Sequence, residues 1–260
     1  MAQRVITYQG KDFAISYEKI LGSKAGTDSQ ILLFLHGWGS NKEVMKIAFG
    51  KHFQNFCHIY VDMPGFGDSA NEVPLKTNDY ASIMEIFTRE VCGVEARECL
   101  IMGHSFGGKV AVLCNPKAMI LLSSAGIKVK KPLKVRTKIA LTKLGNKLGV
   151  RKLGKILRSS DVNMMNEGMY KTFKNVVDED YAPLFGAYKG RAYIFWGRED
   201  RATPLFCAHK IHSLIARSTL FELEGDHYFF LKQGGEIERL YLESKAASAP
   251  FDEDTKQAKE

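Results

Sequence analysis

The sequence predicts an α/β fold, a doubly wound and mostly parallel sheet with helices on both faces. Six short apolar runs each stop at a glycine-rich turn, and runs that are apolar at every position fit strands buried on both faces. The six runs are Ile31–Leu35, Cys57–Val61, Cys99–Met102, Met119–Leu122, Ala192–Trp196 and Thr219–Leu223. Helix-like stretches alternate with these runs, which indicates parallel strands joined by crossover helices.

Local periodicity predicts the helices and the first two strands. The helix-like stretches are Lys42–Phe53, Asn78–Val91, Ser105–Leu113 and Pro204–Ile215. Near the N-terminus, Arg4–Tyr8 and Phe13–Tyr17 alternate between apolar and polar residues, a pattern typical of half-buried strands. We expect these two segments to form an antiparallel hairpin that starts the sheet.

One long interval interrupts the alternation of strands and helices. About seventy residues separate Leu122 from Ala192 without a strand pattern, and structureless loops of that length are rare in compact domains. We therefore predict a helical insertion over the carboxyl ends of the strands. The chain then divides into an α/β core (1–126 and 188–244), a basic helical lid (127–187) and a polar, mobile tail (245–260).

Composition limits the class of protein. With 260 residues, 45% of them hydrophobic, the chain is long enough for one core with an inserted cap. No apolar run approaches the length of a membrane span, and the first residues lack the apolar segment of a secretory signal. The five cysteines are scattered and free of C-x-x-C spacing, which favours reduced thiols in the cytoplasm over disulfides or a zinc site.

A serine lies in a sharp turn between a predicted strand and a predicted helix. The stretch GHSFG places Ser105 between Gly103 and Gly107. In a strand–G-x-S-x-G–helix turn the serine side chain stands out at the end of the sheet, and a side chain at either glycine would collide across the turn. The alternative interpretation is a glycine-rich turn that happens to contain an inert serine.

A serine nucleophile needs a base, and the base needs an acid that orients it. In this kind of fold the chain order is serine, acid, histidine, and Asp200 and His227 each follow a predicted strand in that order. Glu199 is one residue from the favoured position, and Asp226 adjoins His227 and can hardly reach around its ring. The sequence therefore predicts Ser105, Asp200 and His227 as the catalytic residues.

Acyl transfer also needs two N–H donors for the oxyanion. One donor is expected to be Phe106, the residue after the nucleophile, and the other Trp38, in the HGWG loop after the first parallel strand. The remaining histidines are expected to be structural groups. The chain contains neither H-x-x-x-H nor H-E-x-x-H, so we expect no metal, and this chemistry needs no organic cofactor.

Taken together, these segments resemble the α/β-hydrolase superfamily, in particular its lidded, esterase-like members. The matching segments are His36–Gly39 (HGWG), Asp62–Ser69 (DMPGFGDS), Gly103–Gly108 (GHSFGG), Trp196–Asp200 (WGRED) and Gly225–His227 (GDH). The resemblance implies an eight-stranded sheet, a helical lid between strands six and seven, and a triad of Ser105, Asp200 and His227.

The resemblance also narrows the chemistry. Haloalkane dehalogenases and epoxide hydrolases of this fold carry aspartate at the nucleophile position, where this chain has Ser105. Hydrolases of C–C bonds, of the meta-cleavage type, usually have a longer oxyanion loop of the G-P-G-A type, which HGWGSN lacks; they remain an alternative. The HGWG and DMPGFGDS segments look more like those of pimeloyl-carrier-protein methyl esterases.

The positive charge is concentrated in the predicted lid. The net charge is +8, and twelve of the 37 basic residues fall between Ile127 and Ser160, where there is no acidic residue. A helical face there would carry Lys143, Lys147, Arg151 and Lys155. Three interpretations compete: a solvated outer face, an acidic partner such as an acyl carrier protein, or an anionic membrane surface. Nucleic acid is not expected, because interleaved aromatic residues are missing.

A second lid helix is predicted near the end of the insertion. Ser160 or Asp161 is positioned to cap it, and its inner face would carry Met165, Met169, Phe173 and Val177, which either line an acyl pocket or pack against the core. The leading hypothesis for the whole chain is a serine hydrolase that cleaves a carboxylic ester or thioester through an acyl-enzyme. The alternative from a different class is a ligand receptor or signalling protein that keeps the triad without turnover.

Overall fold

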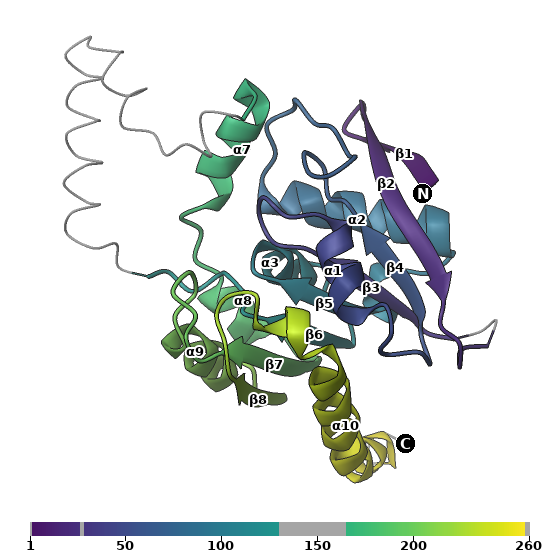
Figure 1. The fold of residues 1–260 in the computed structure, drawn as a ribbon, viewed down its shortest axis with the longest axis vertical. Helices are drawn as coiled ribbons and strands as arrows, with labels where there is room; N and C mark the ends of the chain where they lie inside the picture. Colours follow the sequence, from purple (N-terminus) through teal and green to yellow (C-terminus); the bar gives the residue numbers. More distant parts are fainter. Residues whose placement is uncertain (1, 27–28, 130–164, 258–260) are drawn as a thin grey trace.

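A computed structural model shows one eight-stranded sheet with strand order β1-β2-β4-β3-β5-β6-β7-β8 (Figure 1). It describes residues 2–26, 29–129 and 165–257. The strands are β1 (Ala2–Tyr8), β2 (Lys11–Leu21), β3 (Ile31–Leu35), β4 (Cys57–Val61), β5 (Leu100–His104), β6 (Ala118–Leu122), β7 (Arg191–Gly197) and β8 (Ser218–Leu223). The pairs β1–β2 and β2–β4 are antiparallel, and every other pair is parallel.

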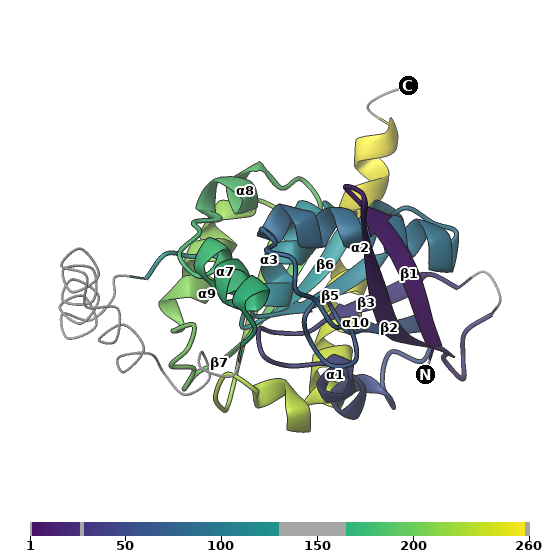
Figure 2. The same cartoon turned by 90° about the horizontal axis from the view of Figure 1, so that it is seen from above.

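Helices cover both faces of this sheet (Figure 2). The α-helices are α1 (Lys42–Phe49), α2 (Thr77–Cys92), α3 (Phe106–Leu113), α7 (Glu167–Val176), α8 (Ala182–Ala187), α9 (Phe206–Leu214) and α10 (Gly234–Gln257), and η1 (Ala96–Glu98) and η2 (Phe229–Lys232) are single 3₁₀ turns. Alternate strand residues point to two separate cores. Leu33 and Ile101 belong to the core that includes residues of α2, α3, α8 and α9, whereas Phe34 and Met102 belong to the core that includes residues of α1, η2 and α10.

The predicted doubly wound, mostly parallel sheet is confirmed. The strand bounds differ from those predicted by two residues or fewer, except that β2 continues four residues beyond Tyr17, to Leu21. Helix α1 ends at Phe49 and not at Phe53, because the chain leaves the helix at Gly50. All five cysteine thiols are free in the structure, and all but the half-buried Cys92 are buried. Within the described ranges, no helix is both long and apolar enough to cross a membrane.

Helix α10 continues to Gln257 and so includes most of the segment 245–260, for which the sequence predicts a polar, mobile tail. Alanine, lysine, glutamate and glutamine in this segment favour the helix, whereas Pro250 opposes it. The mobility of the segment remains a prediction.

Between β6 and β7 the described insertion consists of α7 and α8. Asn166 caps α7, its side chain accepting from the N–H of Met169 at 2.8 Å, so the cap is neither Ser160 nor Asp161. Helix α7 packs on the segment after β4: Thr172 Oγ1 accepts from the Leu75 N–H at 2.9 Å. The basic positions 143, 147, 151 and 155 lie outside the described residues.

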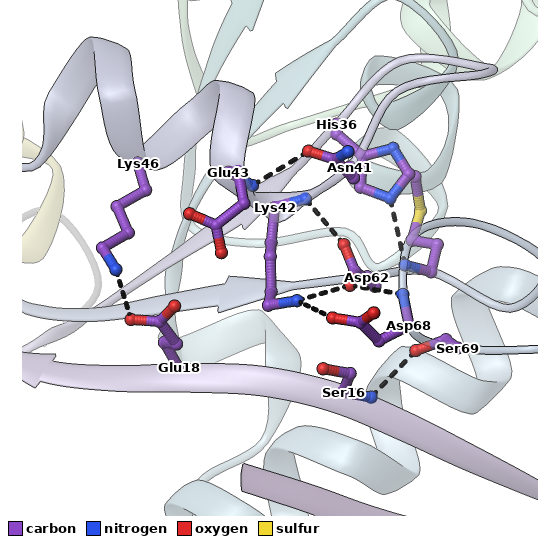
Figure 3. Close-up of polar contacts among 11 residues, drawn as sticks. Ser16, Glu18, His36, Asn41, Lys42, Glu43, Lys46, Asp62, Asp68 and Ser69 are labelled. Atoms are coloured by element: carbon purple, nitrogen blue, oxygen red, sulfur yellow. Dashed lines mark hydrogen bonds and ion pairs between the residues drawn. The ribbon is translucent and has the colours of Figure 1, made fainter. Parts of the chain in front are cut away.

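A buried ion cluster joins the loop after β3 to the loop after β4 (Figure 3). Lys42, the first residue of α1, is 2% exposed, and its Nζ donates to Asp62 Oδ2 at 2.7 Å and to Asp68 Oδ2 at 2.8 Å. The backbone N–H of Lys42 donates to the other Asp62 oxygen at 2.7 Å. The fully buried Asp62 carboxylate is thus neutralised and hydrogen-bonded at both oxygens, as a buried charge requires.

The same two loops are joined a second time through His36. Its Nε2 accepts from the Met63 N–H at 3.1 Å (Figure 3). Its Nδ1 donates to the Gly37 carbonyl at 2.8 Å. Burial lowers the pKa of His36 to about 4, so the ring is neutral at pH 7, as this hydrogen-bond pattern demands. At Gly67, where φ is 51°, a Cβ atom would collide with the Asp62 carboxylate. The HGWG loop is therefore fixed to the DMPGFGDS loop.

We predict that Lys42→Met lowers the free energy of unfolding by about 3–5 kcal/mol, because it leaves the Asp62 carboxylate buried without its cation. Urea unfolding at neutral pH measures the loss. Lys46→Met is the matched control: Lys46 also pairs with a carboxylate, Glu18, but is 36% exposed, so its loss is expected to stay below about 1 kcal/mol. Equal losses in the two variants would contradict this account of the cluster.

Candidate active site

Ser105 lies at the abrupt turn from β5 into α3. Its backbone has φ 49° and ψ −111°, a region that costs a non-glycine residue about 1–3 kcal/mol. Hydrogen bonds hold the strained peptide in place: the Ser105 N–H donates to Leu122 at 3.1 Å, and the Ser105 carbonyl accepts from Ala125 at 3.0 Å. The turn leaves the Ser105 side chain half-buried at the wall of a cavity.

The two glycines around Ser105 are required by close backbone approach. A Cβ on Gly103 would lie 2.6 Å from the carbonyl oxygen of Gly107, and a Cβ on Gly107 would collide with the carbonyl oxygen of Leu35. Both collisions involve backbone atoms, which cannot move aside as a flexible side chain can. This is the packing that the G-x-S-x-G pattern predicts.

Asp200 and His227 form a short hydrogen bond. Nδ1 of His227 lies 2.7 Å from Oδ2 of Asp200, whose side chain is fully buried. Oδ1 of Asp200 accepts from the backbone N–H groups of Ala202 at 2.8 Å and Thr203 at 2.9 Å. Burial alone would raise the pKa of Asp200, but the hydrogen bonds from His227 and Thr203 outweigh it and hold the pKa at about 2. Asp200 is therefore a carboxylate at neutral pH.

His104 connects the His227 loop to the turn at Ser105. Nε2 of His104 donates to the backbone carbonyl of His227 at 3.0 Å, and the two imidazole centroids are 4.7 Å apart. Burial lowers the pKa of His104 to about 3, so its ring is neutral at physiological pH. Since His104 directly precedes Ser105, this contact holds the His227 loop beside the serine.

Two other acids, Glu199 and Asp226, lie less favourably than Asp200 for orienting the His227 ring. Glu199 is exposed, whereas Asp200 is buried. Asp226 Oδ1 accepts from the Tyr228 N–H at 2.8 Å, within its own loop. The structure thus brings Asp200, of the three acids, into contact with the His227 ring.

A cavity of about 690 Å³ opens beside Ser105, and most of its lining side chains are apolar. Trp38, Phe106, Phe173 and Val177 line it, whereas Met169 does not and packs against Gly65 and Asn71. The Trp38 ring lies edge-on to Phe106, with centroids 5.5 Å apart, and contacts Phe173 at 5.5 Å. Aromatic side chains from three segments therefore form one wall.

Trp38 and Phe106, the predicted oxyanion residues, both lie at this cavity with Ser105. Phe106 is the first residue of α3, so its N–H belongs to the helix-terminal donors that have no acceptor within the helix. Trp38 lies in the loop that Lys42 and His36 fix to the loop after β4. Their proximity to Ser105 fits the predicted role, which remains a prediction.

Sequence reasoning missed two groups at this site. The Thr203 hydroxyl donates to Asp200 Oδ2 at 2.8 Å, and no spacing pattern in the sequence predicts this contact. Lys109, in α3, is 3% exposed and lines the cavity, where its Nζ contacts Glu179 at 2.6 Å. A signal for Lys109 was present, because it is the one charged residue in the helical stretch FGGKVAVL.

Comparison with curated proteins finds partial relatives. The chain is 31% identical over 83 residues to a 2-succinyl-6-hydroxy-2,4-cyclohexadiene-1-carboxylate synthase of Citrobacter koseri, covering 32% of this chain and 31% of that protein. It is 33% identical over 99 residues to a pimeloyl-acyl-carrier-protein methyl ester esterase of Pseudoalteromonas atlantica, covering 36% of each chain. These matches span about a third of the relatives' length.

Solved structures share the fold at low identity. An esterase from Thermogutta terrifontis superposes with a TM-score of 0.69 at 15% identity, covering 95% of this chain and 99% of that one. An esterase from Exiguobacterium antarcticum has a TM-score of 0.69 at 20% identity, covering 92% and 98%. The model of the alpha/beta hydrolase family matches residues 32–240, which include the strands β3 to β8 and the turn at Ser105. The chain therefore belongs to the alpha/beta hydrolase family.

Proposed function

We propose that the chain is a serine hydrolase that cleaves a carboxylic ester or thioester through Ser105, His227 and Asp200. The observation that carries this proposal is the 2.7 Å hydrogen bond between Nδ1 of His227 and the buried carboxylate of Asp200. With Nδ1 held as the donor, Nε2 is left unprotonated and can act as a general base. The strained serine turn beside the His227 loop supplies the nucleophile.

The proposed reaction runs through an acyl-enzyme. Ser105 Oγ attacks the carbonyl carbon while Nε2 of His227 takes its proton, and Asp200 stabilises the resulting imidazolium. The N–H groups of Trp38 and Phe106 bind the oxyanion, and His227 then passes the proton to the leaving alcohol or thiol. Water, deprotonated by His227, releases the acid and restores Ser105.

The names of the partial relatives support an ester as substrate, since one of them acts on a methyl ester carried by an acyl carrier protein. We propose a small-molecule ester or thioester, free or carrier-linked, and action in the cytoplasm, which suits five free thiols. Residues 127–187 would act as a lid, with Lys143, Lys147, Arg151 and Lys155 available to an acidic carrier.

A fluorophosphonate probe tests the proposal, because it phosphonylates an activated serine and expels fluoride. Wild-type protein is expected to be labelled at near-neutral pH. Ser105→Ala should abolish labelling, and His227→Ala should slow it by about 100-fold or more. His209→Ala is the matched control: His209 also pairs with a carboxylate, Glu222, but lies 55% exposed on α9. No labelling of folded wild-type protein would favour the receptor alternative.

Replacing the buried acid should leave the fold but remove most of the activity. Asp200→Asn is expected to lower kcat for a simple ester by about 1,000-fold or more, because the imidazole is no longer held in the tautomer that accepts the serine proton. Turnover of a p-nitrophenyl ester measures the loss. Asp226→Asn, one residue before His227, is the control and should change kcat by less than about threefold.

The same variant tests the ionisation of Asp200. Its pKa is about 2 in the folded protein and near 3.9 in an unfolded chain, so its stabilisation is complete above about pH 4 and is lost as the pH falls towards 2. The stability advantage of wild type over Asp200→Asn should therefore narrow by about 1 kcal/mol between roughly pH 7 and pH 3. Denaturant unfolding at several pH values measures it, and a constant difference would show that the folded pKa is not lowered.

A further inference from the structure

A buried lysine stands one helical turn beyond the nucleophile. Lys109 follows Ser105 by four residues, in the first turn of α3, and both residues line the same cavity. Lys109 is 3% exposed and lines the cavity together with Ser105, although its neighbours along α3 are apolar. A charge at such a position requires compensation, which the structure supplies from the inserted segment.

The Lys109 ammonium is paired at two of its three hydrogens. Nζ donates to the Val176 carbonyl, at the end of α7, at 2.7 Å and to Glu179 Oε2 at 2.6 Å. It also lies 4.9 Å from the centroid of the Tyr181 ring, a cation–π contact. Glu179 is itself held by the Thr77 hydroxyl at 2.5 Å. These contacts fix the ammonium at the cavity wall and balance its charge.

Two of the three N–H donors of the Lys109 ammonium have oxygen acceptors among the described residues. The other neighbours of Nζ are the rings of Tyr181 and Phe106, with centroids at 4.9 Å and 5.5 Å, and a ring face is a weaker acceptor for an N–H than an oxygen. An alkyl chain that reached Lys109 would strip water from the third N–H without replacing its hydrogen bond, which is unfavourable for a charged donor. A carboxylate bound directly to this ammonium would lie beside the Glu179 carboxylate, which is 2.6 Å from Nζ, although the cations Lys128 and Arg201 line other parts of the cavity. A neutral oxygen satisfies the donor and leaves the ion pair balanced.

We propose that Lys109, paired with Glu179, is a specificity-determining residue that selects acyl groups carrying a neutral oxygen acceptor, such as an ether, hydroxyl or oxo group, a few atoms beyond the ester carbonyl. This inference rests on the proposed hydrolase function of Ser105. In this proposal the apolar wall formed by Trp38 and Phe173 contacts the carbon chain of the acyl group, and Lys109 donates a hydrogen bond to its oxygen. A good hydrogen bond of this kind discriminates strongly against an analogue that lacks the oxygen.

Isosteric p-nitrophenyl esters test the selection. The set is hexanoate, its ether isosteres propoxyacetate, ethoxypropanoate and methoxybutanoate, and the monoester of glutarate, which ends in a carboxylate. Because the ether oxygen and the free carboxylate also change the intrinsic reactivity of an ester, each kcat/KM is divided by the rate constant of that ester's uncatalysed hydrolysis. In wild type this quotient for the best ether is expected to exceed that for hexanoate by about tenfold or more, and the glutarate monoester should gain no such advantage. Equal values for the ethers and hexanoate would overturn the proposal.

Two variants should shift the preference in different directions. Lys109→Met removes the donor, so the ratio of ether to hexanoate should fall to about one. Glu179→Gln removes the balancing charge, so the glutarate monoester should gain about tenfold relative to hexanoate. Lys171→Met is the matched control, because Lys171 pairs with Glu167 on the exposed side of α7, and it should leave all ratios unchanged. If Lys109 is merely structural, both cavity variants lower every rate alike, which overturns the proposal.

A binding measurement separates this inference from the proposed reaction. Ser105→Ala protein cannot form the acyl-enzyme, so calorimetry with the corresponding methyl esters reports recognition alone. The best ether ester should bind about tenfold more tightly than methyl hexanoate, and Ser105→Ala/Lys109→Met should lose that difference. If wild type turns over no ester, the hydrolase proposal fails while this comparison still decides the role of Lys109; equal affinities in Ser105→Ala would refute that role.

Discussion

The candidate site depends on the turn at which β5 becomes α3. The chain can reverse so sharply only if Ser105 adopts a strained backbone and the flanking glycines let strand and helix backbones touch. That single constraint exposes the Ser105 side chain, starts α3 beneath it and places Lys109 one turn further along. The hydrogen bond from His104 to the His227 carbonyl then attaches the His227 loop to the same turn. One junction thus positions Ser105, the His227 loop and the cavity wall.

Two buried ion pairs stabilise the surroundings of this junction in different ways. The Lys42–Asp62 pair joins consecutive loops at the carboxyl ends of β3 and β4, and so fixes the segment that contains Trp38. The Lys109–Glu179 pair joins α3 to the segment between α7 and α8. Buried pairs contribute little net stability compared with apolar packing, but removing one partner is severe. Here the two ion pairs fix the relative positions of structural elements, because each pair links elements that carry parts of the candidate site.

The sequence predicted what depends on local pattern and chain order. Strands buried on both faces appear as apolar runs such as Ile31–Leu35, and strand ends carry the Ser105, Asp200 and His227 segments in the family's order. It did not predict contacts between distant segments, since Lys42 and Asp62, or Lys109 and Glu179, have no shared pattern in the chain. The extension of α10 has no clear signal in the sequence, because the segment is polar and contains Pro250. The Asn166 cap has none either, because several polar residues precede α7 and each could cap a helix.

The most direct test of the central claim is to trap the covalent intermediate. The protein would be mixed with excess p-nitrophenyl ester, quenched in acid within the burst phase and digested, and the site of acylation identified by mass spectrometry. The account predicts that the acyl group is found on Ser105, in the peptide that joins β5 to α3. Turnover with the acyl group on another residue, or with no acylated residue in the quenched protein, would contradict it.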